Sequence, residues 1–287
     1  MSTIAPGVHE APTVKIGRTR GWRLLDIREL WEYRELNYYL TLREIKVRYK
    51  QTVVGIAWAL LQPVGMMVIF TVVFDRIANL PSDGVPYPLF AFSALLPWQL
   101  FARILNESSS SLIADQRLIT RVYFPRIIVP TASATAALLD FLIGCVLLAG
   151  LMAWYGVAPG LEVLAVPGFM LLMMVSALGV GYWLSALNLE YRDVRYMIPF
   201  LSQAWLFATP VFYSSTLVPD RWQLLYGINP SVGVITGMRW SLLGTPAPSL
   251  PMLAISVGIA LFLFLSGILW FRSREKTFAD AVGSGGR

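Results

Sequence analysis

The feature that most constrains this chain is a series of long apolar segments separated by shorter charged ones. A helix needs about 20 apolar residues to cross the roughly 30 Å hydrocarbon core of a bilayer. Six segments approach or exceed this length, at residues 53–74, 87–105, 127–154, 161–189, 198–213 and 252–271. The fifth is short, and Pro97 shortens the second. The pattern predicts an all-α polytopic membrane protein with six transmembrane helices.

The composition agrees with this fold class and excludes several kinds of chemistry. Charged residues make up 14% of the chain, against about 25% in soluble domains. The single cysteine, Cys145, excludes a disulfide within the chain, and with His9 as the single histidine a Cys/His metal site is excluded. No catalytic constellation and no GxxxxGK[ST] phosphate loop is present, so any energy must be supplied by a partner or an ion gradient. A net charge of +6 fits anionic lipid headgroups rather than nucleic acid.

The distribution of Lys and Arg predicts the orientation of the chain. If the N-terminus is cytoplasmic, all 23 of these residues except Arg76, Arg221 and Arg239 fall in cytoplasmic segments. Basic residues concentrate on the cytoplasmic side of membrane proteins. The sequence therefore predicts that both termini are cytoplasmic.

Residues 33–63 change abruptly from a charged, aromatic half to an apolar half after Lys50 and Gln51. From Trp22 to Leu40 the apolar residues repeat at helical spacing, with Trp and Tyr on one side and Arg elsewhere, which is typical of a helix at a bilayer interface. These features divide the chain into four segments: a cytoplasmic tail (1–21), an amphipathic interface helix with its junction (22–52), the transmembrane domain (53–271) and a C-terminal cytoplasmic tail (272–287).

Three connections within the transmembrane domain have distinct patterns. The first cytoplasmic loop, 106–126, contains a serine run, Ser108–Ser111, which favours a helix break or cap. The loop also has a small apolar face and predicts a short helix that either docks on a cytoplasmic partner or packs on its own lipid interface. The second cytoplasmic loop, 188–196, is compact and mixed in charge. The external stretch 214–251 is rich in proline, and its apolar pieces are too short to cross, which favours short re-entrant helices between the last two spans. Gly233 and Gly237 form a GxxxG pattern that would permit close helix contact.

An ionisable residue inside a span is a functional candidate by default, and Asp140 is the clearest example. It either has a direct transport role, pairs with Arg103, or lies at a wet subunit interface. Aromatic residues near the spans either face lipid or line a pathway where their faces stack on sugar rings. The candidates for such a pathway are Trp58, Phe92, Trp98, Phe101, Trp205, Phe212 and Tyr213.

Several segments of the chain are similar, in the same order, to the permease subunits of polysaccharide ABC exporters, which export O-antigen, capsule and teichoic-acid-type polymers. They are YRELNYYLTLREIKVRYKQTVVGIAWALLQP (33–63), LITRVYFPRIIVP (118–130), NLEYRDVRYMIPF (188–200), TPVFYS (209–214) and INPSVGVITGMRW (228–240). The resemblance extends over residues 22–275. It does not cover residues 1–21, which stay unassigned.

The resemblance implies a homodimer of six-helix subunits in the bacterial inner membrane, with two separate ATPase subunits that bind ATP and Mg. No cofactor is implied for this chain itself. The cargo would be a polysaccharide on a polyprenyl pyrophosphate lipid. The coupling segment for the ATPase would comprise Asp115, Arg117, Leu118, Ile119, Tyr123, Phe124 and Pro125. The external gate would include Trp222, Tyr226 and Arg239.

A pyrophosphate headgroup needs cations at the membrane interface, where Arg binds phosphate through two hydrogen bonds. The candidates are Arg34, Arg43, Arg48 and Lys50, which could instead be ordinary positive-inside anchors. Alternative functions are an ABC exporter of another lipid, a drug or an ion, a membrane-embedded transferase, and a scaffold. The transferase would need clustered Asp, Glu or His residues at one membrane face, which the sequence does not show.

Overall fold

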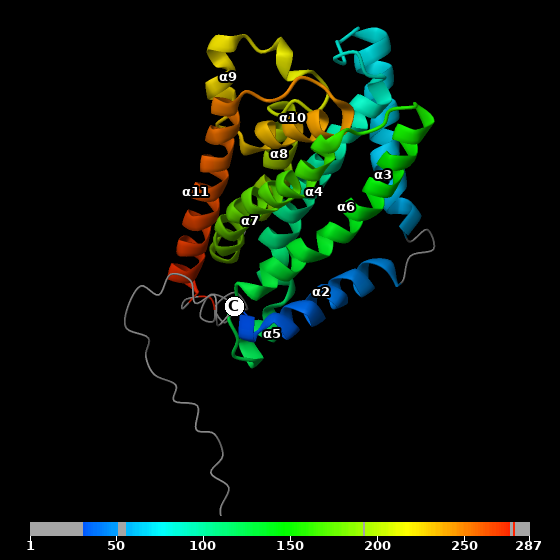
Figure 1. The fold of residues 1–287 in the computed structure, drawn as a ribbon. Helices are drawn as coiled ribbons and strands as arrows, with labels where there is room; N and C mark the ends of the chain where they lie inside the picture. The colour runs from blue at the N-terminus through cyan, green and yellow to red at the C-terminus, as the bar shows by residue number, and fades with distance from the viewer. Residues whose placement is uncertain (1–30, 51–55, 192, 276–277, 279–287) are drawn as a thin grey trace, which may run out of the picture.

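The computed structural model of the chain describes residues 31–50, 56–191, 193–275 and 278 (Figure 1). The expected tail at 1–21, the first part of the expected interface helix and the end of the C-terminal tail lie outside the described residues. The described helices are α2 (Arg34–Tyr49), α3 (Ile56–Phe70), α4 (Tyr87–Ala114), α5 (Gln116–Arg121), α6 (Ile128–Trp154), α7 (Val166–Glu190), α8 (Val194–Phe207), α9 (Asp220–Tyr226), α10 (Pro230–Leu243) and α11 (Leu250–Arg274). Short π or 3-10 pieces, η1 (Thr71–Ile77), η2 (Leu161–Ala165) and η3 (Ser215–Leu217), extend or join them.

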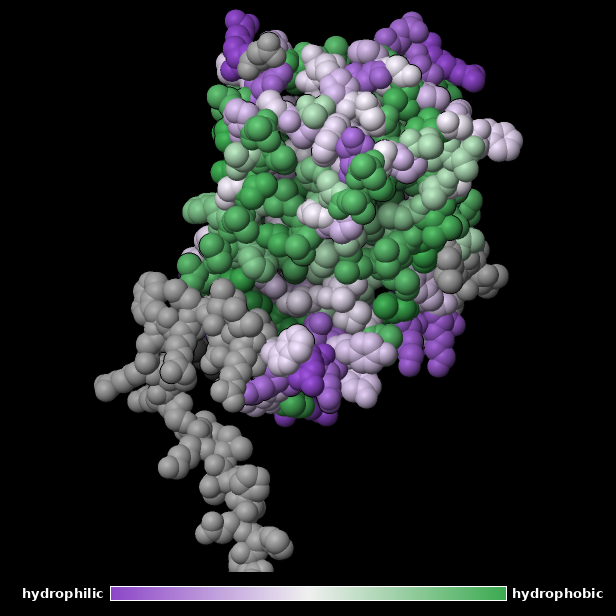
Figure 2. Space-filling view, in the orientation of Figure 1, coloured by the Kyte–Doolittle hydropathy of each residue, from purple (hydrophilic) through white to green (hydrophobic). Residues whose placement is uncertain are grey.

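The all-α prediction is confirmed, since the part of the chain that is described contains no strand. Among the described residues, five helical segments are long and apolar enough to cross a membrane: Leu60–Ile77, Tyr87–Ala114, Ile128–Trp154, Leu161–Glu190 and Leu250–Arg274. Figure 2 shows an apolar band across the middle of the visible face of the molecule, with polar residues gathered at its two ends. The molecule therefore has the surface of a multi-pass membrane protein.

The expected fifth span at 198–213 is not a continuous helix. Helix α8 has 14 residues, about 21 Å at 1.5 Å per residue, and ends at Phe207. The chain then turns at Thr209 and Pro210, because the residue before a proline is driven out of the helical region and the proline has no N–H to donate. A count of six spans is not confirmed, since α8 alone is shorter than the bilayer core.

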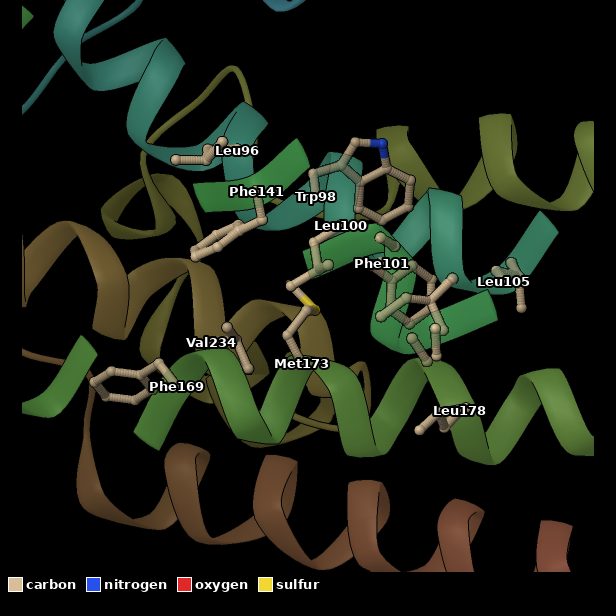
Figure 3. Close-up of a cluster of buried hydrophobic side chains, with 14 of the residues drawn as sticks. Leu96, Trp98, Leu100, Phe101, Leu105, Phe141, Phe169, Met173, Leu178 and Val234 are labelled. Atoms are coloured by element: carbon tan, nitrogen blue, oxygen red, sulfur yellow. The ribbon is translucent and has the colours of Figure 1, made fainter. Parts of the chain in front are cut away.

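Helix α4 forms the centre of the bundle. In its apolar window 78% of the residues are buried, against 17–33% in the other four candidate spans. It packs against α6 and α7, and Figure 3 shows Leu100 of α4 beside Met173 of α7. The four outer helices keep large apolar faces exposed, which suits contact with lipid or with another subunit.

The expected serine-rich loop after residue 105 is helical, which corrects the expectation that Ser108–Ser111 breaks or caps a helix. Helix α4 continues to Ala114. The Ser108 hydroxyl donates to the Ile104 carbonyl at 2.5 Å, and the Ser111 hydroxyl donates to the Ser108 carbonyl at 2.7 Å. These bonds satisfy the hydroxyls within the helix, and the small size of the serine side chains permits α7 to approach closely.

Close approach of helices also explains several glycines. A Cβ on Gly237 of α10 would lie 2.2 Å from the Phe169 ring of α7, and one on Gly233 would lie 2.7 Å from Ser256 of α11. The expected close contact at this GxxxG pattern is confirmed. Helices α7 and α11 also touch tightly, because a Cβ on Gly179 would lie 2.5 Å from the backbone nitrogen of Phe264.

We predict that Gly179→Ala destabilises the protein by about 1–3 kcal/mol, the usual cost of overpacking. The clash is with the backbone of α11, which cannot rotate away as a side chain can. Thermal unfolding of the purified protein in detergent measures the effect. Gly258→Ala is the matched control, because nothing lies within 4 Å of a Cβ at that position of α11. Equal melting temperatures for the two variants would contradict the tight α7–α11 contact.

Candidate functional site

The candidate site is built around α2, which runs alongside the first half of α6 (Figure 1). Leu40 and Thr41 are its buried residues, and the Thr41 hydroxyl donates to the Asn37 carbonyl of its own helix at 2.8 Å and reaches the Ala132 carbonyl of α6 at 3.4 Å. The helix extends nine residues beyond Leu40, where the amphipathic pattern of the sequence ended. Its two long faces carry different groups of charges.

The outer face of α2 borders a hollow of about 440 Å³ that is lined by Tyr39, Leu42, Arg43, Lys46, Val47 and Lys50. Arg43, Lys46 and Lys50 are spaced three and four residues apart, which places them on one side of a helix. The apolar and aromatic members of the set lie on the same side. The hollow therefore combines cations with an apolar wall, which is the chemistry of a site for an anionic amphiphile.

Arg48 points into the protein instead, to a cluster of four charges where α2, α4 and α6 meet. Its Nη1 lies 2.5 Å from Oδ2 of Asp140 on α6, and its Nη2 lies 2.5 Å from Oε2 of Glu107 on α4. Arg103 of α4 forms a second ion pair with Asp140, and the Tyr49 hydroxyl donates to the other oxygen of the same carboxylate. The predicted pairing of Asp140 with Arg103 is confirmed, and two arginines balance two carboxylates.

Arg43 connects α2 to the predicted coupling segment. Its Nη2 lies 2.5 Å from Oδ2 of Asp115 and 2.9 Å from Oε1 of Glu44. Partial burial lowers the pKa of Arg43, but the hydrogen bonds to Asp115 and then to Glu44 outweigh it, and the net effect is a raised pKa. Arg43 is therefore always cationic, and it belongs both to the hollow and to the contact between α2 and the α4–α5 junction.

The four predicted headgroup cations therefore have three different environments. Arg43 and Lys50 line the hollow, and Arg48 is held by carboxylates. Arg34 lies at the start of α2, where its Nη1 donates to the Trp31 carbonyl at 3.1 Å and its guanidinium lies 5.3 Å from the centre of the Trp31 ring. The prediction from sequence omitted Lys46, which its spacing from Arg43 and Lys50 along one helix face could have identified.

The predicted coupling segment is part helix and part extended chain. Helix α5 begins after Asp115, and Val122–Ile127 links it to α6. Ile119, Phe124 and Pro125 are buried, whereas the side chain of Tyr123 is 90% exposed. Arg117 is exposed and Leu118 is half-buried. The segment is thus anchored by its apolar residues and presents a tyrosine and arginines to solvent.

The predicted pathway aromatics lie mainly inside the subunit. Those that are buried are Phe92, Trp98, Phe101 and Phe212. Trp205 is half-buried and donates from Nε1 to Oδ1 of Asn229 at 2.9 Å. The hydroxyl groups of Tyr213 and Tyr226 lie 2.5 Å apart. The side chain of Trp58 lies outside the described part of the structure. A role in lining a pathway stays a prediction, and it requires the buried rings to become uncovered.

Arg239 of the predicted gate is almost completely buried and binds backbone carbonyls. Nη1 donates to the Pro210 carbonyl at 2.7 Å and to that of Tyr213 at 3.1 Å, and Nη2 donates to the Val211 carbonyl at 2.7 Å. The guanidinium also lies 3.4 Å from the centre of the Phe90 ring. Arg239 therefore fixes the turn after α8 onto α10 and the start of α4, while Trp222 of α9 is 50% exposed.

Comparisons with known proteins agree with this arrangement. A family model described as ABC-2 type transporter matches residues 35–243, from α2 to the end of α10. The chain is similar to an O-antigen export system permease protein of Myxococcus xanthus, with 29% identity over 89% of this chain and 98% of the relative. It is also similar to an O-antigen export system permease protein of Klebsiella pneumoniae, with 27% identity over 71% of this chain and 79% of the relative. A polysialic acid transport protein of Escherichia coli is 24% identical over 83% of this chain and 92% of the relative.

We predict that Asp140→Asn destabilises the protein by about 3–5 kcal/mol, because it removes the carboxylate that neutralises two partly buried arginines. Thermal or denaturant unfolding in detergent measures the loss. Glu190→Gln is the control, because Glu190 pairs with Arg274, whose side chain is 41% exposed, and such a pair contributes about 1 kcal/mol or less. If the two variants unfold alike, the four-charge cluster does not hold α2 in place.

Proposed function

Because the chain belongs to the ABC-2 type transporter family, we propose that it is the membrane subunit of an ATP-driven exporter for a polysaccharide carried on a polyprenyl pyrophosphate lipid. The observation that carries the proposal is the family match from α2 to α10, which includes the hollow, the coupling segment and the external helices. The names of the three relatives support a polysaccharide as cargo. The polymer would move from the cytoplasm across the inner membrane.

We propose a homodimer of six-span subunits with both termini in the cytoplasm. In this arrangement α8 and the turn after it make up the additional, shorter span, and α9 and α10 are the external gate helices. The exposed apolar faces of the outer helices leave surface for a second copy, since 17–33% of the residues in their apolar windows are buried. A pathway between two copies would need the gate helices to separate.

The hollow on α2 supports the proposed cargo. A pyrophosphate carries several negative charges and acceptor oxygens, which match the guanidinium of Arg43 and the ammonium groups of Lys46 and Lys50. Tyr39 and Val47 offer apolar surface to the first units of a polyprenyl chain or to lipid. We propose this hollow as the place where the headgroup of the lipid-linked polymer first binds.

The coupling segment supports a separate ATPase partner. The sequence has no phosphate loop of its own, so ATP and Mg would be bound by two copies of that partner. The exposed ring of Tyr123, together with Arg117 on α5, would contact the ATPase, while Ile119 and Phe124 transmit its movement to α4 and α6.

We predict that deletion of this subunit causes lipid-linked polymer to accumulate in the cytoplasm, and that the purified protein retains a bound ATPase. Extraction of polyprenyl-linked glycans, with labelling of intact and lysed spheroplasts to locate them, measures the first outcome. Export of a drug or a simple lipid in place of the polymer would support the alternative ABC exporter. Loss of a glycosyl or acyl group from a finished, exported polymer would support a membrane-embedded transferase.

We also predict that a cysteine at Tyr123 forms crosslinks to the ATPase subunit in membranes. The crosslink should form because the Tyr123 side chain is 90% exposed. Ile119→Cys is the control, since Ile119 is 3% exposed and should react little. Both variants need the native Cys145 replaced by serine. A crosslink from Ile119 but not from Tyr123 would show that another surface contacts the ATPase.

A further inference from the structure

Arg43 belongs to two parts of the protein at once. On one side it lines the hollow together with Lys46 and Lys50. On the other side its Nη2 binds Asp115 at 2.5 Å and Glu44 at 2.9 Å. The side chain of Arg43 is 41% exposed, whereas that of Asp115 is 15% exposed. An anion in the hollow can therefore reach the guanidinium from the open side, while Asp115 holds it from within.

Asp115 occupies the break between two helices. Helix α4 ends at Ala114 and α5 begins at Gln116, and Asp115 has φ −102° and ψ 24°, outside the helical region. Its carbonyl accepts hydrogen bonds from the backbone N–H groups of Leu118 and Ile119, which start α5. The position of its side chain is thus tied to the direction in which α5 leaves α4.

The charges around the hollow favour an exchange of partners at Arg43. The three cations are Arg43, Lys46 and Lys50, and the two carboxylates are Glu44 and Asp115, so the surplus is one positive charge. A phosphate monoester, with a charge of about −1.5 to −2 near pH 7 and three oxygens, is matched by the two lysines alone. A pyrophosphate brings more negative charge and more oxygens, and it gains most when Arg43 turns to it, because charge-assisted bonds to guanidinium are strong. Asp115 then loses its partner.

We propose that Asp115 is a positioning residue that couples the two sites. When a pyrophosphate headgroup binds in the hollow, Asp115 transmits this binding to the coupling segment. The headgroup replaces Asp115 on Arg43, and the released Asp115 allows α5 and Tyr123 to move relative to α2. Because coupling between two sites is reciprocal, movement of α5 by the partner in turn frees Arg43 and tightens the hollow on the headgroup. This inference rests on the proposed function of the hollow as the headgroup site.

The test uses the full chain in nanodiscs, with Cys145→Ser and spin labels at cysteines replacing Tyr38 and Tyr123. Both positions are exposed, at 60% and 90%. The probe is geranylgeranyl pyrophosphate, and the comparison ligand is geranylgeranyl monophosphate. Addition of the pyrophosphate should change the distance between the labels, and the monophosphate should leave most of the population in the original distance. An unchanged distance with saturating pyrophosphate overturns the proposal.

Two substitutions distinguish the movement of the coupling segment from the binding of the pyrophosphate. Asp115→Asn should bind the pyrophosphate about fivefold tighter or more, a modest coupling factor, and should no longer show the distance change. Glu44→Gln is the matched control: it also removes a carboxylate from Arg43, so binding should tighten, but Asp115 remains and the distance change should persist. Weaker or unchanged binding by Asp115→Asn overturns the proposal, and so does loss of the distance change in both variants.

The experiment distinguishes failure of the proposed coupling through Asp115 from failure of the proposed headgroup site. Lys46→Gln should weaken binding of the probe without abolishing the distance change at saturation, because Lys46 lines the hollow and Arg43 keeps its bond to Asp115. If the unmodified protein binds no pyrophosphate at all, the headgroup site fails and the inference falls with it. If it binds with no distance change, the inference alone fails.

Discussion

The fold depends on a neutral cluster of four charges placed inside a membrane protein. Separate arginines or carboxylates at this depth would be expensive, and together they satisfy one another. Asp140 of α6 is shared by Arg48 and Arg103, and Glu107 completes the balance. Because the partners come from α2, α4 and α6, the need for neutrality determines where the N-terminal helix lies against the bundle.

The cluster divides the cations of α2 between structure and binding. Arg48 is committed to the carboxylates on the inner side, so it adds little positive charge to the outer face. Arg43, Lys46 and Lys50 remain on the side of the hollow. A helix that lay loose on a membrane would present all its cations to lipid headgroups alike. Because α2 docks on α6, its cations are divided between an inner and an outer face. The outer face then has the chemistry of a defined anion site.

The sequence was sufficient to predict the class of fold and much of the site, because hydropathy and charge act locally along the chain. The long apolar runs predicted three of the five candidate spans to within three residues, and the first candidate span overlaps its predicted range from Leu60 onward. They did not predict the extension of α4 through the serines. That extension depends on contacts with α7, such as the bond from Asn188 Nδ2 to the Ser109 carbonyl at 2.9 Å. The pairing of Asp140 with Arg103 of α4 was among the predictions. The pairing of Arg48 with Glu107 was not, because nothing in the local pattern shows which carboxylate an arginine of α2 will contact.

The region between α8 and α11, predicted to be external, shows where sequence reasoning stops. The prolines at 219–251 indicated short helices, and α9 and α10 are short. Arg239 was predicted in the external gate, and the sequence did not show that its guanidinium would be buried and bound to backbone carbonyls. The turn at Pro210 leaves carbonyls without helical partners, and buried carbonyls must find donors within the protein. Arg239 supplies the donors, so a buried arginine holds the turn that ends α8.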